Sequence, residues 1–145
     1  MTPSQIRIEL LRQHEEIREA ITATRSAATR SPVDLHGLRT SALRLADRLR
    51  RHNLDEEELL QAVLSTADAW GPMRIEIMNE QHVAEHEQLW SALLEVGSTS
   101  EVDALRQIVL GAIDRVLGHM AREETVYLSE DVLRDDAVVI DQCSG

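Results

Sequence analysis

Apolar residues recur at steps of three and four along most of this 145-residue sequence, and few residues interrupt them. Such spacing puts the apolar residues on one face of an α-helix. Only 6 Gly and 3 Pro are present, too few for the frequent turns of a β-sandwich. Phe is absent and aromatic residues make up 2% of the chain, so the core must be aliphatic. The sequence therefore predicts an all-α protein.

Helix start and stop signals divide the chain into four segments. Thr2–Gln5 and Ser98–Glu101 have the pattern of capping boxes, in which side chains satisfy the free N–H groups of a helix start. Ser31-Pro32 and Gly71-Pro72 place proline in a first helical turn, where no N–H donor is needed. The helices predicted from these signals start at Thr2, Ser31, Gly71 and Ser98 and end near residues 28, 65, 97 and 128.

Four long helices with short joins favour an up-down-up-down antiparallel four-helix bundle with a short C-terminal tail. We place the bundle at residues 1–128 and the tail at residues 129–145. For the acidic tail we expect a helical turn followed by an extended end that docks on the bundle.

Each apolar stripe contains one short polar window. At about 1.5 Å per residue, all four windows lie about 10–18 Å from the same end of an antiparallel bundle. Seven polar side chains should therefore meet in one buried layer. They are His14, His52, Glu56, His82, His86, His119 and Glu123.

Bound cations would remove the several kcal/mol that each buried, unsatisfied polar group costs. Three of the four windows hold two donors that are four residues apart, on one helix face. Seven ligands exceed what one ion takes, so we expect two metals. If both carboxylates bridge, the metals receive three and two histidines, and a bridging oxo or hydroxo ligand leaves one position open. Nitrogen and oxygen donors without thiolate suit iron, with manganese or zinc as alternatives.

A lone histidine on an apolar stripe is more often a hydrogen-bonded core residue than a ligand. Here five histidines lie at matching heights on four helices, and three windows hold a pair with i,i+4 spacing. This arrangement favours ligands. His36 is near the opposite end of the bundle, and we expect no metal role for it.

The ordered motifs resemble the hemerythrin-like (HHE cation-binding) family over about residues 5–128. The motifs are His14, then His52–Glu56 (HxxxE), His82–His86 (HxxxH), and His119 with a carboxylate four or five residues on. The resemblance implies a binuclear non-haem iron site with a bridging oxo or hydroxo ligand. It also implies that His82, His86 and His119 hold one iron, His14 and His52 the other, and Glu56 and the final carboxylate both. Oxygen, peroxide, nitric oxide or azide would bind at an open position on the iron held by two histidines.

The final carboxylate departs from the family's oxygen-carrying branch, which typically ends in HxxxxD. This chain offers Glu123 and Glu124 at the two spacings. The apolar stripe places Glu123 inward and Glu124 about 100° further round the helix, so Glu123 is the expected ligand and Glu124 the alternative. Glutamate in place of aspartate resembles the branch linked to sensing, redox chemistry or iron handling.

Residues one helical turn from the expected ligands should line the site. A dry aliphatic wall would slow the loss of a bound ligand. Tyr127 could donate a hydrogen bond into the site, act as a redox-active phenol, or close the bundle end. Trp70 and Trp90 are expected in the core or at its boundary. The expected wall residues are Ile17, Leu49, Leu89 and Val116.

Charged residues cluster on the second helix. The basic row is expected to be a solvated face, with a docking surface for an acidic partner as the alternative. The acidic cluster is expected to be solvated. The basic residues are Arg44, Arg48, Arg50 and Arg51, and the acidic ones are Asp55, Glu57 and Glu58.

Composition narrows the function classes. With 15 basic and 26 acidic residues, the net charge of −11 argues against binding nucleic acid. The single cysteine, Cys143, excludes an intramolecular disulfide. We expect it to be incidental, with a redox thiol or a cross-link between two chains as the alternatives. No apolar run approaches the roughly 18 residues of a membrane span, and no signal peptide is apparent. We therefore expect a soluble, cytoplasmic protein that contacts no membrane.

The leading hypothesis is a stand-alone di-iron protein that binds or reduces oxygen, peroxide or nitric oxide, with redox enzyme activity as an open question. One alternative is a metal-dependent signalling module that acts on an unidentified protein partner. The other is iron storage or donation.

Overall fold

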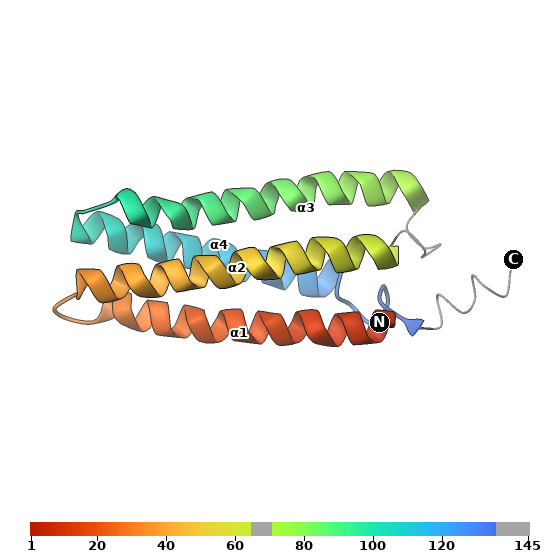
Figure 1. Cartoon of the computed structure of the whole chain (residues 1–145), viewed down its shortest axis with the longest axis horizontal. Helices are drawn as coiled ribbons and strands as arrows, with labels where there is room; N and C mark the ends of the chain where they lie inside the picture. The colour runs from red at the N-terminus through yellow and green to blue at the C-terminus, as the bar shows by residue number, and fades with distance from the viewer. Residues whose placement is uncertain (65–70, 136–145) are drawn as a thin grey trace, which may run out of the picture.

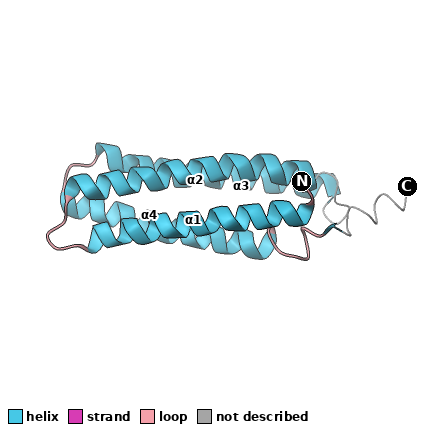
Figure 2. Cartoon of the chain, turned by 60° about the horizontal axis from the view of Figure 1, so that its bottom comes forward, coloured by secondary structure: helices cyan, strands magenta, loops and turns pink. Residues whose placement is uncertain are grey.

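A computed structural model of the chain is an all-α, up-down-up-down bundle of four antiparallel helices, as predicted (Figure 1). It describes residues 1–64 and 71–135, with the backbone alone for residue 64 and residues 71–79. Each helix packs against its two neighbours around the bundle, and the α1–α2 and α3–α4 joins lie at the same end (Figure 2). The elements are α1 (Pro3–Thr29), α2 (Leu35–Leu64), α3 (Gly71–Leu94), the 3₁₀-helix η1 (Glu95–Ser98) and α4 (Val102–Val126).

The predicted capping box at the start of α1 is confirmed. The Gln5 backbone N–H donates to Thr2 Oγ1 at 3.2 Å, and the Thr2 N–H donates to Gln5 Oε1 at 2.8 Å. Pro3 occupies the first helical turn. These two hydrogen bonds satisfy N–H groups that the helix itself leaves free.

The predicted start of the second helix at Ser31 is wrong. Helix α2 begins at Leu35, and its first intrahelical bond runs from the Leu38 N–H to the Asp34 carbonyl oxygen at 2.9 Å. Ser31 and Pro32 therefore belong to the connection before the helix.

The predicted capping box at Ser98 is also wrong. Glu101 caps α4, because its carboxylate accepts from the Asp103 and Ala104 N–H groups at 3.0 and 2.7 Å. The hydroxyls of Ser98 and Thr99 instead donate to the Glu95 carbonyl oxygen, both at 3.0 Å. The chain thus tightens into η1 after Leu94, and α3 ends three residues before the expected Gly97.

The aliphatic core has two parts. The larger fills the half of the bundle that holds the α1–α2 and α3–α4 connections. The smaller lies near the N-terminus and comprises Ile6, Leu10, Leu60, Val63, Leu128 and Leu133. On α1, His14 stands between Leu10 of the smaller part and Ile17 of the larger. The polar layer therefore separates two apolar regions. No described helix is both long and apolar enough to cross a membrane.

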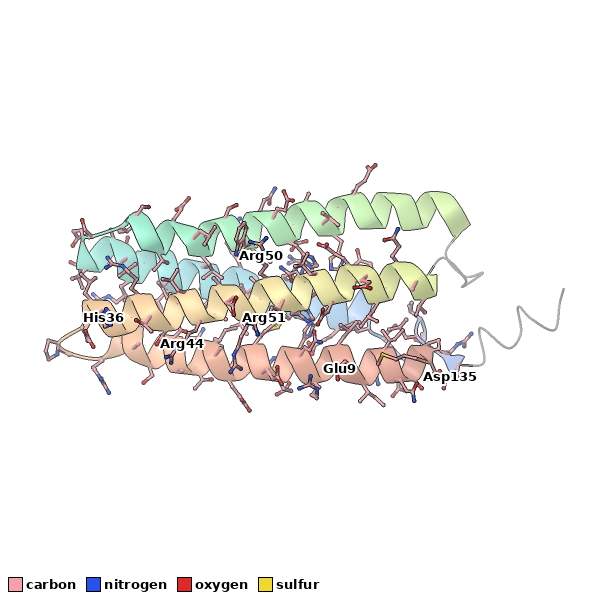
Figure 3. The ribbon with its side chains drawn as sticks, in the orientation of Figure 1. Glu9, His36, Arg44, Arg50, Arg51 and Asp135 are labelled. Carbon is pink, nitrogen blue, oxygen red and sulfur yellow. The ribbon has the colours of Figure 1, made fainter. Side chains whose placement is uncertain are left out.

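The described part of the C-terminal tail folds back onto the start of α1. Leu133 is 2% exposed and packs in the smaller core part with Ile6 and Leu10. The Asp135 carboxylate accepts from the Ser4 N–H at 2.9 Å and the Ser4 hydroxyl at 2.8 Å, and Figure 3 shows it beside the N-terminal end of α1. The tail thus closes the end of the bundle nearest the polar layer. Trp70 and Cys143 lie outside the described residues.

We expect Leu133→Ala to lower the free energy of unfolding by about 2–4 kcal/mol, the usual loss for a buried leucine. Urea denaturation followed by circular dichroism measures this loss. The matched control is Leu54→Ala, because Leu54 is 55% exposed and should change stability by about 0.5 kcal/mol or less. Equal losses for the two variants would contradict the docked tail.

Candidate metal centre

The structure brings all seven residues of the expected polar layer together. Each of the four helices contributes, and the residues on α2, α3 and α4 come in pairs one turn apart. All seven are at most 4% exposed. Helical periodicity explains this locally, since i and i+4 share a face. The residues are His14, His52, Glu56, His82, His86, His119 and Glu123.

The ligand atoms fall into two overlapping groups. In each group the donor atoms lie within 4.8 Å of one another. Both groups contain Glu56 and Glu123, so the two carboxylates are shared. The first group adds the three histidines of α3 and α4, His82, His86 and His119, and we call it the three-histidine group. The second adds His14 and His52, and we call it the two-histidine group.

The two oxygens of Glu56 face different groups. Its Oε1 lies 2.8 Å from His82 Nε2 and 3.4 Å from His86 Nε2. Its Oε2 lies 3.0 Å from His52 Nε2 and 3.7 Å from His14 Nε2. The carboxylate therefore stands between the two sets of imidazoles, with one oxygen toward each.

Glu123 also contacts both groups, but one of its oxygens lies between a histidine of each. Its Oε2 lies 2.5 Å from His82 Nε2 and 3.5 Å from His86 Nε2. Its Oε1 lies 3.1 Å from His119 Nε2 and 3.3 Å from His14 Nε2. Donors about 2.1 Å from a shared ion and at right angles to each other would be about 3 Å apart, so these separations suit a shared metal.

Several inward donor atoms have no hydrogen-bond partner within the protein. Among the described residues these include both oxygens of Glu56, Oε1 of Glu123, and Nε2 of His86 and His119. The Nε2 atoms of His14 and His52 face each other at 3.1 Å. Buried, unpaired polar atoms are costly, and cations would satisfy them. The donor set, which contains nitrogen and oxygen but no sulfur, therefore fits metal ions.

Two carboxylates orient the three-histidine group from outside. His86 Nδ1 donates to Glu57 Oε1 at 2.9 Å, and His119 Nδ1 donates to Glu85 Oε1 at 2.9 Å. Glu85 also pairs with Arg122. These bonds put the proton on Nδ1 and leave Nε2 free to bind a metal. The expectation that Glu57 is simply solvated is wrong, because its side chain is 26% exposed and bonds a histidine of the site.

The two-histidine group has different outer partners. His52 Nδ1 donates to the amide oxygen of Gln13 at 2.8 Å. His14 Nδ1 is 3.4 Å from Glu124 Oε2, and both oxygens of Glu124 accept from Arg18, at 2.9 and 2.6 Å. Neither Gln13 nor Glu85 was predicted from the sequence to take part in the centre. No periodicity marks them, because their roles depend on how neighbouring helices pack.

Burial and hydrogen bonding shift the pKa values of the layer. Burial raises the pKa of Glu56, but the imidazoles that surround the carboxylate outweigh this effect and hold the pKa well below its usual range. Burial lowers the pKa of His119 from 6.5 to about 4, although the hydrogen bond to Glu85 opposes this. At neutral pH the carboxylate is thus ionised and the imidazole neutral, the forms that bind metals.

We expect acid to destabilise the metal-free chain. Because the pKa of His119 falls from 6.5 to about 4 on folding, the unfolded chain binds a proton between these values that the folded chain does not. Stability contributed by this group is therefore full above pH 6.5 and falls toward pH 4. Urea denaturation at pH 7 and pH 5 measures the fall, which should be smaller in His119→Gln. Identical pH profiles for the two proteins would contradict the shift.

The predicted wall residues and Tyr127 lie next to the layer. Ile17, Leu49, Leu89 and Val116 are at most 4% exposed and belong to the larger core part. The Tyr127 ring centroid lies 4.9 Å from that of His82. Burial raises the pKa of Tyr127, and the charges of Glu85 and Glu56 add to this, so the phenol keeps its proton. Contact of these residues with a bound ligand stays a prediction.

The residues expected to lie outside the centre do so. His36 is exposed at the opposite end of the bundle (Figure 3). Trp90 is half-buried, and the Arg50 guanidinium carbon lies 4.2 Å from its ring centroid. The four arginines of the basic row are exposed, as a solvated face requires. Asp55 is exposed and accepts a hydrogen bond from Gln13 at 3.2 Å.

Three surface pockets are lined in part by residues of the centre. One, beside the three-histidine group, is lined by His86, Glu57 and Trp90. Another is lined by Gln13, Ile17 and His52 of the two-histidine side, together with charged residues of α1 and α2. The third is lined by His82, His119, Glu123 and Tyr127 on the three-histidine side. A small molecule therefore has a surface depression next to either group.

The fold and the buried layer together define a helical bundle of the histidine–carboxylate, cation-binding class. The family model described as the hemerythrin HHE cation binding domain matches residues 6–130. The chain belongs to this family, as its motifs predicted. Comparisons with curated proteins and with solved structures gave no match.

Glu123 and Glu124 should differ sharply when each is replaced by alanine. Glu123 is 1% exposed and faces both groups of histidines, whereas Glu124 pairs with Arg18 at the edge of the layer. We expect Glu123→Ala to lower metal affinity by at least 100-fold and Glu124→Ala by about 10-fold or less. Competition with a metal chelator measures both. Equal losses would contradict the inward placement of Glu123.

Proposed function

We propose that this protein holds two iron ions in a non-haem centre that binds or reacts with oxygen, peroxide or nitric oxide. The observation that carries the proposal is the division of Glu56, whose Oε1 faces the three-histidine group and whose Oε2 faces the two-histidine group. A single ion would leave one oxygen and one set of imidazoles unused. Two ions would use every inward donor.

The proposed ligand sets are unequal. His82, His86 and His119 would hold one iron, and His14 and His52 would hold the other. Glu56 and Glu123 would bind both irons, with an oxo or hydroxo ligand between them. The two-histidine iron thus has one protein ligand fewer, which leaves room for a small diatomic or peroxide ligand. Iron bound there would offer a free coordination position to such a ligand and could change reversibly between its ferrous and ferric states.

The protein's own residues would control access and stability of the centre. The apolar side chains of Ile17 and Leu49 lie one turn from the two histidines and exclude water from that side. Gln13 and His52 line the adjoining surface pocket, which gives a small ligand a place beside the two-histidine group. Iron is favoured over zinc for redox chemistry, and the nitrogen and oxygen donor set accommodates it.

The test is an ultraviolet-visible spectrum of the iron-loaded protein, reduced without air and then exposed to air, together with an iron count. We expect two irons per chain and a charge-transfer band that appears in air. A band that disappears when oxygen is removed would indicate carriage or oxygen sensing. Irreversible oxidation to a diferric spectrum would indicate peroxide or nitric oxide chemistry, or iron handling.

Two results would overturn the proposal. If the chain takes up no iron, the proposed di-iron centre is wrong. A count of one iron per chain that does not rise when iron is in excess would contradict the bridging role of Glu56 and Glu123. His36→Ala is the matched control, because His36 is exposed at the opposite end and should leave both the iron count and the spectrum unchanged.

A further inference from the structure

The outer partners of the two histidine groups differ in charge. In the three-histidine group, His86 and His119 each donate from Nδ1 to a carboxylate oxygen at 2.9 Å. In the two-histidine group, His52 donates to the neutral amide oxygen of Gln13 at 2.8 Å. The contact of His14 with Glu124 is longer, at 3.4 Å. Arginines offset the charge of two outer carboxylates, Arg18 that of Glu124 and Arg122 that of Glu85, so the clear contrast is between Glu57 beside His86 and Gln13 beside His52.

This difference bears on how strongly each histidine binds a metal. A carboxylate that accepts from Nδ1–H pushes electron density toward Nε2 and makes the imidazole a stronger ligand. Hydrogen bonds to a charged acceptor are roughly twice as strong as those to a neutral one. A neutral amide oxygen orients the ring equally well but pushes less electron density toward Nε2. The three-histidine group therefore has the stronger ligands as well as the larger number of them.

The orientation of Gln13 is fixed by its own amide nitrogen. Gln13 Nε2 donates to Glu9 Oε1 and to Asp55 Oδ2, both at 3.2 Å. These two bonds turn the amide oxygen toward His52 Nδ1. Arg12 pairs with Glu9 and holds the pKa of that carboxyl at about 2, so Glu9 is a fixed acceptor. The neutral partner of His52 is thus held in place by two flanking carboxylates.

We propose that the two positions take up metal in order, the three-histidine position first, and that Gln13 keeps the second ion weakly held. Gln13 is a positioning residue that acts through His52, and it keeps the position held by His14 and His52 exchangeable. Glu57 strengthens metal binding at the first position, because it accepts the hydrogen bond of His86. This inference rests on the proposed two-metal centre.

Exchanges between carboxylate and amide side chains of the same shape test the proposed order of metal uptake. Glu57→Gln keeps an oxygen that can accept from His86 but removes the charge. Gln13→Glu adds a charge beside His52 and is combined with Asp55→Asn, which puts a donor in place of one of the two flanking carboxylates. The other, Glu9, stays paired with Arg12. The matched controls are Glu58→Gln, next to Glu57 on α2, and Gln107→Glu on α4, both at exposed positions.

The measurement is a titration of the metal-free full chain with cobalt(II), followed by visible absorption. Cobalt(II) stands in for ferrous iron, and its absorption reports ligand geometry. A parallel anaerobic competition between a chelator and ferrous iron gives the affinities. In the unmodified chain we expect two steps whose dissociation constants differ by at least about 10-fold.

The variants should move the two steps in opposite ways. Glu57→Gln should weaken the first step by about 10-fold or more, and Gln13→Glu with Asp55→Asn should tighten the second by about 10-fold. Both changes bring the two dissociation constants closer together, whereas the control variants leave their ratio unchanged. Two equal steps in the unmodified chain, or variants that behave like their controls, would overturn the ordering but leave the two-metal centre intact. Uptake of a single ion would instead overturn the proposed function.

Discussion

Replacing His86 by alanine should leave the chain unable to bind two irons while its helical content stays unchanged. His86 Nε2 faces Glu56 Oε1 at 3.4 Å and Glu123 Oε2 at 3.5 Å, and it has no hydrogen-bond partner of its own. Without it the three-histidine group loses one of three imidazoles, and both carboxylates lose a neighbour. We expect the iron count to fall from two per chain to one or fewer.

The iron count after gel filtration and far-ultraviolet circular dichroism test this expectation together. Retained helicity matters, because it separates lost binding from lost folding. His36→Ala, at an exposed position of the opposite end, is the matched control and should keep two irons. Two irons in His86→Ala would contradict the ligand assignment, and loss of iron in the control would show that the assay responds to substitutions away from the centre.

Removing the metal should lower the thermal midpoint by about 10 °C. The layer buries seven polar side chains, and several of their atoms have no partner in the metal-free chain. A ligand present at about 1,000 times its dissociation constant stabilises the folded state by about 4 kcal/mol, and about 1 kcal/mol shifts the midpoint of a domain this size by roughly 2–4 °C. Metal binding thus offsets the cost of the buried layer.

Thermal unfolding of chelator-treated and iron-loaded protein measures this difference. The control is His86→Ala, whose midpoint should rise less with added iron than that of the unmodified chain, because it holds fewer irons. Equal midpoints for the loaded and metal-free forms of the unmodified chain would mean that the layer is satisfied without metal. That result would argue for a structural histidine cluster and against the proposed function.

The helices themselves were predictable because helix formation follows local periodicity. The stripe that contains His14, for example, needs only the 3.6-residue period to place Leu10 and Ile17 on the same face. The helix starts were less predictable. Serine is a preferred cap residue and glutamate is not, yet Glu101 caps α4 and the Ser98 hydroxyl donates to the Glu95 carbonyl oxygen. Residue-type preference alone therefore does not fix where a helix starts.

The seven residues of the layer could also be identified from the sequence. Their spacing fixes the face of each helix, and counting from the helix ends fixes their height. The choice of Glu123 over Glu124 follows from the same period, since Glu124 lies about 100° further round the helix. The outer partners could not be identified in this way. Glu57 was expected to be solvated, and Gln13 carried no signal.

By itself, the sequence determined four amphipathic helices, the aliphatic core and the buried polar layer at one height of the bundle. Only the tertiary structure decided that Glu56 divides its oxygens between two sets of histidines, and that Glu57 and Gln13 give those sets different outer partners. The physical reason is that a residue's face is set within its own helix by local geometry. Contacts between residues of different helices depend instead on the offset and rotation at which the helices pack, and the interlocking of the whole aliphatic core sets both.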